Sequence, residues 1–120
     1  MKRIIIADPD PAFRRALALL ITRRLDVQSI DEAGDTGTLI QKLADAPPDL
    51  LLLNWSIHGV PGPETCILLR NTYPAMKVIL LSLNPEDAET ARCAGAGFIC
   101  KSSSPEKTLE VLRSVLTQGE

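Results

Sequence analysis

The sequence has little of what marks several specialised classes of protein. Only 3% of its 120 residues are aromatic, one is histidine, and no apolar run approaches the roughly 18 residues that a membrane span needs. The net charge is −2 with basic and acidic residues well mixed, so nothing indicates a nucleic-acid-binding surface. The first apolar run is too short for a secretory signal. We therefore expect a cytoplasmic protein that contacts neither membrane nor nucleic acid directly.

The cysteines are too few and too irregularly spaced for a disulfide framework or a zinc site. Cys66, Cys93 and Cys100 form no CxxC pair and no Cys/His pattern, and each lies in an apolar stretch. An odd number of such thiols is typical of free, buried cysteines in a reducing compartment. We therefore expect three buried thiols and no metal site.

What the sequence does contain is a regular alternation of strand-like and helix-like segments. Five apolar runs predict strands, at residues 3–7, 27–31, 50–53, 78–81 and 98–100. The first, third and fourth runs are continuous rather than alternating, which is typical of a parallel sheet covered on both faces. With 45% hydrophobic residues, a chain of this length can bury one core. The pattern predicts a single α/β domain over residues 1–120, built on a doubly wound parallel sheet.

Helix start signals lie between these runs. Asp10, Asn84 and Ser104 are capping residues that each precede a proline, the residue favoured at the first helical position. The helix that opens at Asn84 should end near Gly95. Two further helices, less clearly bounded, are expected at residues 38–44 and 63–72.

The residues that follow the predicted strands suggest a site. They are Asp8, Pro9 and Asp10 after the first strand, Asn54 after the third, Ser82 after the fourth and Lys101 after the fifth. In an open doubly wound sheet, the carboxyl ends of the strands converge on a crevice where the strand order reverses. Acids would hold Mg²⁺ there, and a lysine and a hydroxyl would hold phosphoryl oxygens.

With these residues, the chain resembles the receiver domain of two-component response regulators over essentially its whole length. The resemblance is carried by the segments IIIADPDPAFRRAL, PDLLLLNWSIHGVPGPETCILLR, KVILLSLNPED and AGAGFICKSSSPEKTLEVLRSVL. It implies a flavodoxin-like five-stranded sheet of order 2-1-3-4-5 with five helices. It also implies an aspartate on the third strand that is phosphorylated by a histidine kinase, and two acids that bind Mg²⁺. Asp8 matches the first acid, Ser82 the hydroxyl residue, Lys101 the lysine and Phe98 the switch aromatic.

The departures from the receiver pattern all affect the site. Asn54 stands at the phosphoacceptor position, Pro9 at the second metal-binding acid, Leu83 at a position usually kept small, and His58 at a turn proline. An amide oxygen is a far poorer nucleophile than a carboxylate. Losing two carboxylates should remove most of the drive to dehydrate Mg²⁺. We therefore expect a degenerate receiver without Mg²⁺ binding or enzyme activity, in which Asp8 and Lys101 neutralise each other and Asn54 bridges them.

Several of these residues also have simpler interpretations. Asp10 is a better helix cap than substitute metal ligand. Ser82 suits a strand end as well as a switch, and Phe98 is more often a core aromatic than a moving part. Trp55 could be exposed or could fold over the crevice. A ligand role for the lone His58 is improbable.

The favoured function is a phosphorylation-independent pseudo-receiver that acts through a protein partner or as a dimer. The final segment, LEVLRSVLTQGE, resembles the end of receivers that precede a helix-turn-helix output domain. A transcription-regulating, DNA-binding domain outside these residues is therefore expected from the resemblance. Two alternatives stay open: a phosphorelay receiver modified at a substitute residue such as Asp10 or Ser82, and a small-ligand-binding flavodoxin-like domain. Against the latter, Asp-Pro-Asp-Pro offers few N–H groups for phosphate.

Overall fold

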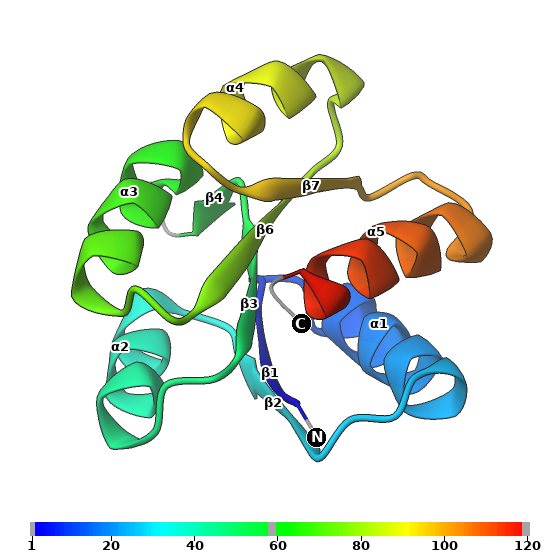
Figure 1. Cartoon of the computed structure of the whole chain (residues 1–120), viewed down its shortest axis with the longest axis horizontal. Coiled ribbons are helices and arrows are strands. Elements are labelled where there is room, and N and C mark those ends of the chain that lie inside the picture. The colour runs from blue at the N-terminus through cyan, green and yellow to red at the C-terminus, as the bar shows by residue number, and fades with distance from the viewer. Residues whose placement is uncertain (1, 58–59, 119–120) are drawn as a thin grey trace.

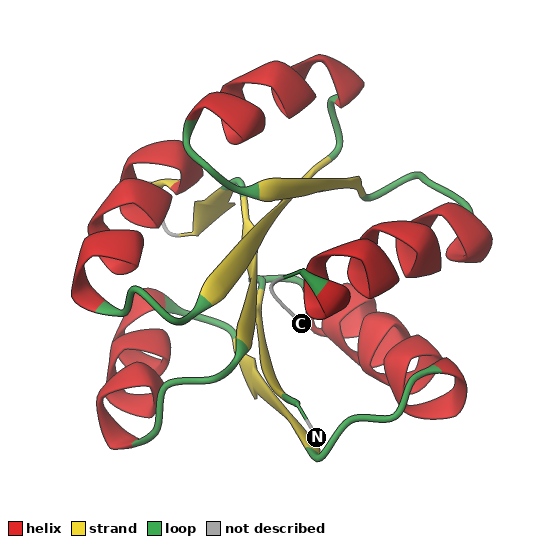
Figure 2. Ribbon diagram, in the orientation of Figure 1, coloured by secondary structure: helices red, strands yellow, loops and turns green. Residues whose placement is uncertain are grey.

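Five parallel strands form one sheet with helices on both faces in the computed structural model, which describes residues 2–57 and 60–118 (Figures 1 and 2). The strands are β1 (Arg3–Ala7), β2 (Ser29–Ala33), β3 (Leu50–Asn54), β6 (Lys77–Ser82) and β7 (Gly97–Cys100). Their order in the sheet is β2-β1-β3-β6-β7. In chain order this is 2-1-3-4-5, so the predicted flavodoxin-like fold is confirmed.

The helices divide between the two faces of the sheet. They are α1 (Pro11–Arg24), α2 (Thr36–Asp45), α3 (Gly62–Thr72), α4 (Ala88–Cys93) and α5 (Pro105–Thr117). Figure 1 shows α1 and α5 on one face, with α2, α3 and α4 on the other. Two buried clusters follow this division: α1 and α5 contribute to one, and α2, α3 and α4 to the other. The described helices contain no stretch that is both long and apolar enough to cross a membrane.

The central strands are continuous apolar runs because both of their faces are covered. Successive residues of β1 enter opposite clusters: Ile4 packs with the α1 and α5 side chains, and Ile5 packs with those of α2, α3 and α4. Leu50 and Leu51 of β3 divide in the same way. Alternation of side chains between the two faces of a strand produces this arrangement. The inference from continuous runs to a doubly covered sheet is therefore confirmed.

The second strand begins two residues later than predicted. It spans Ser29–Ala33 and pairs with β1 from Arg3↔Ser29 to Ala7↔Ala33. Only Ala33 of this edge strand is buried, and exposed Asp31 separates the half-buried Ile30 and Glu32, so the strand lacks the continuous apolar run of the central strands. A short hairpin, β4 (Ser56–Ile57) with β5 (Val60–Pro61), was not predicted.

Two of the three predicted helix caps form. The Asp10 side chain accepts hydrogen bonds from the backbone N–H groups of Ala12 and Phe13, and Ser104 caps α5. Asn84 makes no side-chain cap, because a 3-10 turn, η1 (Pro85–Asp87), precedes α4. The end near Gly95 is confirmed, and the φ angle of this residue is +79°, a conformation that favours glycine.

The three cysteines are free, but the expectation that all are buried is wrong. Cys66 is buried, Cys100 is half-buried and Cys93 is exposed. Cys93 ends α4 on the solvent side, and the apolar residues next to it in sequence point elsewhere because of the helical period. Burial raises the pKa of the Cys66 thiol, and the Arg70 charge partly opposes this effect.

Candidate functional site

The carboxyl ends of β1, β3, β6 and β7 place the predicted site residues at one edge of the sheet. Asp8 follows β1, Asn54 ends β3, Ser82 ends β6 and Lys101 follows β7. Parallel pairing aligns these ends, with Asn54 opposite Leu81 on the neighbouring strand. The topology therefore gathers residues from both halves of the chain into one crevice.

A buried ion pair joins Asp8 to Lys101. The Asp8 side chain is fully buried, and its Oδ2 lies 2.7 Å from the Lys101 Nζ, whose side chain is 13% exposed. The other carboxylate oxygen, Oδ1, accepts a hydrogen bond from the backbone N–H of Asp10 at 2.9 Å. A buried charge is tolerated when it is paired, and losing one partner of such a pair is costly. The structure therefore brings Asp8 and Lys101 into the direct contact expected from the sequence.

Two further groups hold the Lys101 ammonium. The Asn54 Oδ1 accepts a hydrogen bond from Nζ at 3.4 Å, and the Phe13 ring centroid lies 4.4 Å from Nζ. The Asn54 Nδ2 donates to the backbone carbonyl of Ser56. The amide is thus a donor on one side and an acceptor on the other. A carboxylate at this position could only accept, so it would face the Ser56 carbonyl without a hydrogen bond.

The Ser82 hydroxyl is committed to the loop that follows it. Ser82 is buried, and its Oγ donates to the Asp87 Oδ2 at 2.6 Å and accepts from the Asn84 backbone N–H at 3.0 Å. A serine hydroxyl has a single proton, which Asp87 takes here. Sequence reasoning missed Asp87, because nothing in the sequence tells whether this acid turns back toward the strand or faces solvent.

The residues present do not fit the Mg²⁺ that the fold family implies. Pro9 has no ligand atom in its side chain, Asp10 caps α1, and the Asp8 Oδ2 faces an ammonium. In the described part of the chain, no three His, Cys, Asp or Glu side chains gather where they could hold a metal ion. Mg²⁺ requires several oxygen ligands in octahedral geometry.

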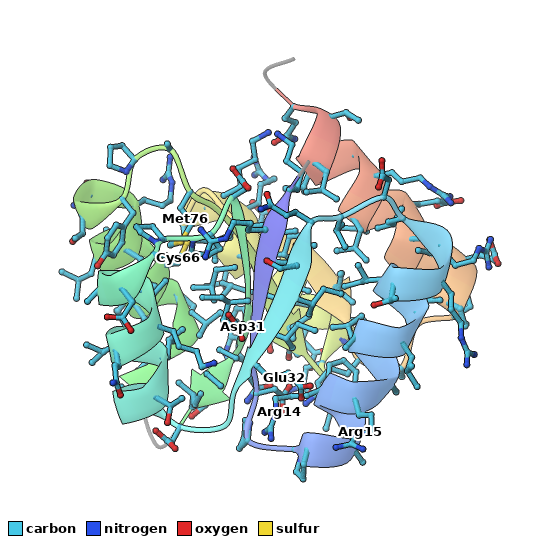
Figure 3. All side chains as sticks on the ribbon, turned by 90° about the horizontal axis from the view of Figure 1, so that it is seen from below. Arg14, Arg15, Asp31, Glu32, Cys66 and Met76 are labelled. Atoms are coloured by element: carbon cyan, nitrogen blue, oxygen red, sulfur yellow. The ribbon has the colours of Figure 1, made fainter. Side chains whose placement is uncertain are left out.

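Arg14 contacts the backbone of the crevice at Asp8. This role was not predicted from the sequence. Its Nη1 donates to the Asp8 backbone carbonyl at 2.6 Å, and its Nε lies 3.1 Å from the Glu32 Oε1. Figure 3 shows Arg14 and Glu32 facing each other between α1 and β2. These contacts fix the end of β1 to its neighbours. The contact with Glu32 joins residues 18 positions apart, and neither contact belongs to a local motif.

An aromatic pair lies beside the crevice. The rings of Trp55 and Phe98 meet edge to face, with centroids 6.3 Å apart, and both side chains are partly buried against the α2–α4 side of the core. Trp55 is therefore neither freely exposed nor isolated, and Phe98 packs as an aromatic of the core edge. Leu83 is 69% exposed. His58 lies outside the described residues.

Comparison with known proteins agrees with this geometry. The profile of the response regulator receiver domain family matches residues 4–113. The chain is 31% identical over 116 residues to the transcriptional activator protein ExaE of Pseudomonas putida, covering 94% of this chain and 54% of that protein. It is 30% identical over 112 residues to the nitrate/nitrite response regulator protein NarL of Escherichia coli K12, covering 91% and 52%. The chain thus spans about half the length of the curated relatives it matches.

Solved structures show the same similarity. A two-component response regulator of the LuxR family from Aurantimonas sp. SI85-9A1 superposes with a TM-score of 0.85 at 26% identity, covering 97% of this chain and 85% of that one. The signal receiver domain of the putative response regulator NarL from Mycobacterium tuberculosis gives 0.77 at 25% identity, covering 99% and 98%.

Proposed function

Because this chain belongs to the response regulator receiver domain family and is similar to its LuxR/NarL-type members, we propose that it is a pseudo-receiver, which signals through protein contacts without being phosphorylated. The observation that carries the proposal is the ion pair between Asp8 and Lys101, closed over by the Asn54 amide. In this crevice a lysine of the chain supplies the positive charge that faces the buried acid.

The chemistry of Asn54 supports the proposal. Phosphoryl transfer to a side chain needs a nucleophile that can attack phosphorus, and a neutral amide oxygen is a poor one. Here the oxygen also accepts a hydrogen bond from the Lys101 ammonium, which withdraws electron density from it. The nitrogen is held by the Ser56 carbonyl, so both ends of the amide have structural partners.

The charge balance supports the loss of Mg²⁺ binding. Lys101 already neutralises the Asp8 carboxylate, and the Asp87 carboxylate accepts the Ser82 proton. A pair of unit charges about 4 Å apart is worth about 4 kcal/mol at an effective dielectric constant of about 20. A metal ion would have to displace this ammonium and give up bound water for a single carboxylate, which does not compensate for the loss.

The substitute phosphorylation sites are disfavoured by their contacts. Asp10 accepts from two backbone N–H groups at the start of α1, and the Ser82 proton is donated to Asp87. Modifying either residue would break a helix cap or the η1 turn. Neither Asp10 nor Ser82 is therefore available to take the place of Asn54 as the phosphoacceptor of an active receiver.

The output of the proposed pseudo-receiver is a change in transcription. Two of its relatives are named as a transcriptional activator and a nitrate/nitrite response regulator, and each is about twice as long as the matched segment. We propose that residues 1–120 are the receiver part of a longer regulator. A DNA-binding domain would follow it, and a protein partner or a second copy would bind the receiver.

The test is treatment with acetyl phosphate and Mg²⁺, followed by intact mass spectrometry and analytical ultracentrifugation. We expect no phosphoryl adduct and no change in oligomeric state. The positive control is a variant with both carboxylates restored, Pro9→Asp with Asn54→Asp. A stoichiometric adduct on the unmodified sequence would refute the proposal, whichever residue carries it.

A further inference from the structure

A cavity of about 540 Å³ lies between α1 and the segment that joins β7 to α5. Figure 1 shows α1 and α5 next to each other on one face of the sheet. The floor is apolar and includes Phe13, Leu17, Leu20 and Ile99. Leu19, which is 48% exposed, contributes an apolar side chain to the lining. We call this the α1–α5 cavity.

Among the residues that the structure describes, the charged side chains that line the α1–α5 cavity are all cationic. They are Arg23, Arg24 and Lys101. Arg24 pairs with Glu106 at 3.3 Å, and Lys101 pairs with Asp8. Within residues 2–57 and 60–118, Arg23 makes no ion pair or side-chain hydrogen bond. The cavity therefore combines an apolar floor with one guanidinium available to an anion.

We propose that the α1–α5 cavity binds a small amphipathic anion, with its apolar body on Phe13, Leu17 and Leu20 and its carboxylate on Arg23. Cavities of roughly 300–1,000 Å³ that are mainly apolar, with few convergent polar groups, are typical of small-molecule sites. The planar guanidinium of arginine can donate two parallel hydrogen bonds to a carboxylate. A ligand bound in this cavity would give the pseudo-receiver an input signal, which the proposed function alone does not include.

A second copy of the chain is the competing occupant of this cavity. Arg24 and Lys101 already have acidic partners in their own chain, whereas Arg23 has none among the described residues. An anionic occupant supplies Arg23 with a counter-charge.

The cavity is in contact with the crevice through shared residues. Phe13 lines the cavity, and its ring centroid also lies 4.4 Å from the Lys101 Nζ. An occupant that moves the Phe13 ring therefore changes the environment of the Lys101–Asp8 pair. This contact is the route by which a ligand would act on the crevice residues, and it requires no phosphoryl group.

The test is an NMR titration of the ¹⁵N-labelled chain with octanoate, with octanol as the uncharged comparison. We expect saturable shifts of amides in residues 13–24 and 99–108, and a smaller shift of the Asn54 side-chain amide that follows the same binding curve. Arg23→Gln should weaken octanoate binding about fivefold and leave octanol binding unchanged, since a partly exposed ion pair contributes little more than this. The matched control is Arg15→Gln, on the same helix but outside the cavity lining (Figure 3).

A second variant tests the cavity itself. Ala16 lines the cavity and is exposed, so Ala16→Trp should fill it without disturbing the core, and both octanoate and octanol should stop binding. Three outcomes would overturn the proposal: no saturable shifts, shifts that leave residues 13–24 and 99–108 unaffected, or equal losses for Arg23→Gln and Arg15→Gln. If the amides that line the cavity shift with protein concentration and not with octanoate, the face serves self-association and the proposal is also overturned. None of these outcomes depends on whether acetyl phosphate modifies the chain.

Discussion

Trp55 and Phe98 pack edge to face, at an interplanar angle of 85°, across the strand that separates β3 from β7. Each is a near neighbour in sequence of a crevice residue: Trp55 follows Asn54, and Phe98 precedes Lys101 by three positions. The ends of β3 and β7 are thus joined twice, once by the aromatic rings and once by the Asn54–Lys101 hydrogen bond. Two such contacts favour a single fixed arrangement, as the proposed pseudo-receiver function requires.

Removing the Lys101 charge should destabilise the fold strongly. Lys101→Met leaves the buried Asp8 carboxylate without its partner, and we expect a loss of about 3 kcal/mol in the free energy of unfolding. Urea denaturation at neutral pH measures this. Lys107→Met, at an exposed position of α5, should change stability by less than about 0.5 kcal/mol. Adding Asp8→Asn to Lys101→Met should recover part of the loss, and an equal or larger loss would contradict the ion-pair interpretation.

Restoring the phosphoacceptor alone should not restore phosphorylation. Asn54→Asp places a carboxylate near Asp8, removes the donor to the Ser56 carbonyl and supplies no second metal ligand. Mg²⁺ would still lack the ligands that align a phosphoryl group for attack. Intact mass after acetyl phosphate and Mg²⁺ should show an adduct only when Pro9→Asp is added. If Asn54→Asp alone is modified as readily as the double variant, Pro9 is a tolerated substitution and the account of the site is wrong.

Mg²⁺ should leave the single tryptophan unaffected. Trp55 directly follows Asn54 and is held by Phe98, so a metal ion bound in the crevice would alter its fluorescence. Titration to millimolar Mg²⁺ should give no saturable change for the unmodified sequence, because Lys101 already neutralises Asp8. The Pro9→Asp, Asn54→Asp variant should show a transition. A saturable response of the unmodified chain that Asp8→Ala abolishes would reveal a ligand that the charge argument overlooks.

Stability should fall at alkaline pH through Cys66. Burial raises the pKa of this thiol above its usual value of 9.0. The folded state therefore holds the proton more tightly than the unfolded state, and its stabilising effect is complete below that value and decreases as the pH rises above it. The free energy of unfolding, measured below and above pH 9, should decline less steeply with pH for Cys66→Ala than for the unmodified chain. Cys93→Ala, at an exposed thiol, should keep the original slope.

The sequence predicted the sheet better than it predicted the site. Continuous apolar runs such as 50–53 follow directly from burial on both faces, so the order of elements and the doubly covered sheet could be predicted. The Asp10 cap depends on neighbouring residues only, and it was also predictable. The edge strand β2 was misplaced because two of its five residues, Ser29 and Asp31, face solvent.

The missed contacts share a physical cause. Arg14 meets Glu32, and Ser82 meets Asp87, through side-chain orientations that depend on how helices and loops settle on the sheet. A residue pattern predicts which side chains lie at the carboxyl edge of the sheet. It does not predict which of them pair, because several pairings are possible. Lys101 was expected to meet Asp8 because no other acid was certain to face it. The contact with the Phe13 ring, by contrast, was not expected.

The buried Asp8–Lys101 pair also has a consequence for biosynthesis. Asp8 emerges from the ribosome before its counter-charge, which lies beyond the last strand of the sheet. Until β7 has been translated, burial of the carboxylate would leave a lone charge in an apolar setting, which is strongly unfavourable. We therefore expect the nascent chain to leave this edge of the sheet hydrated, and to bury Asp8 only after its own lysine has been translated.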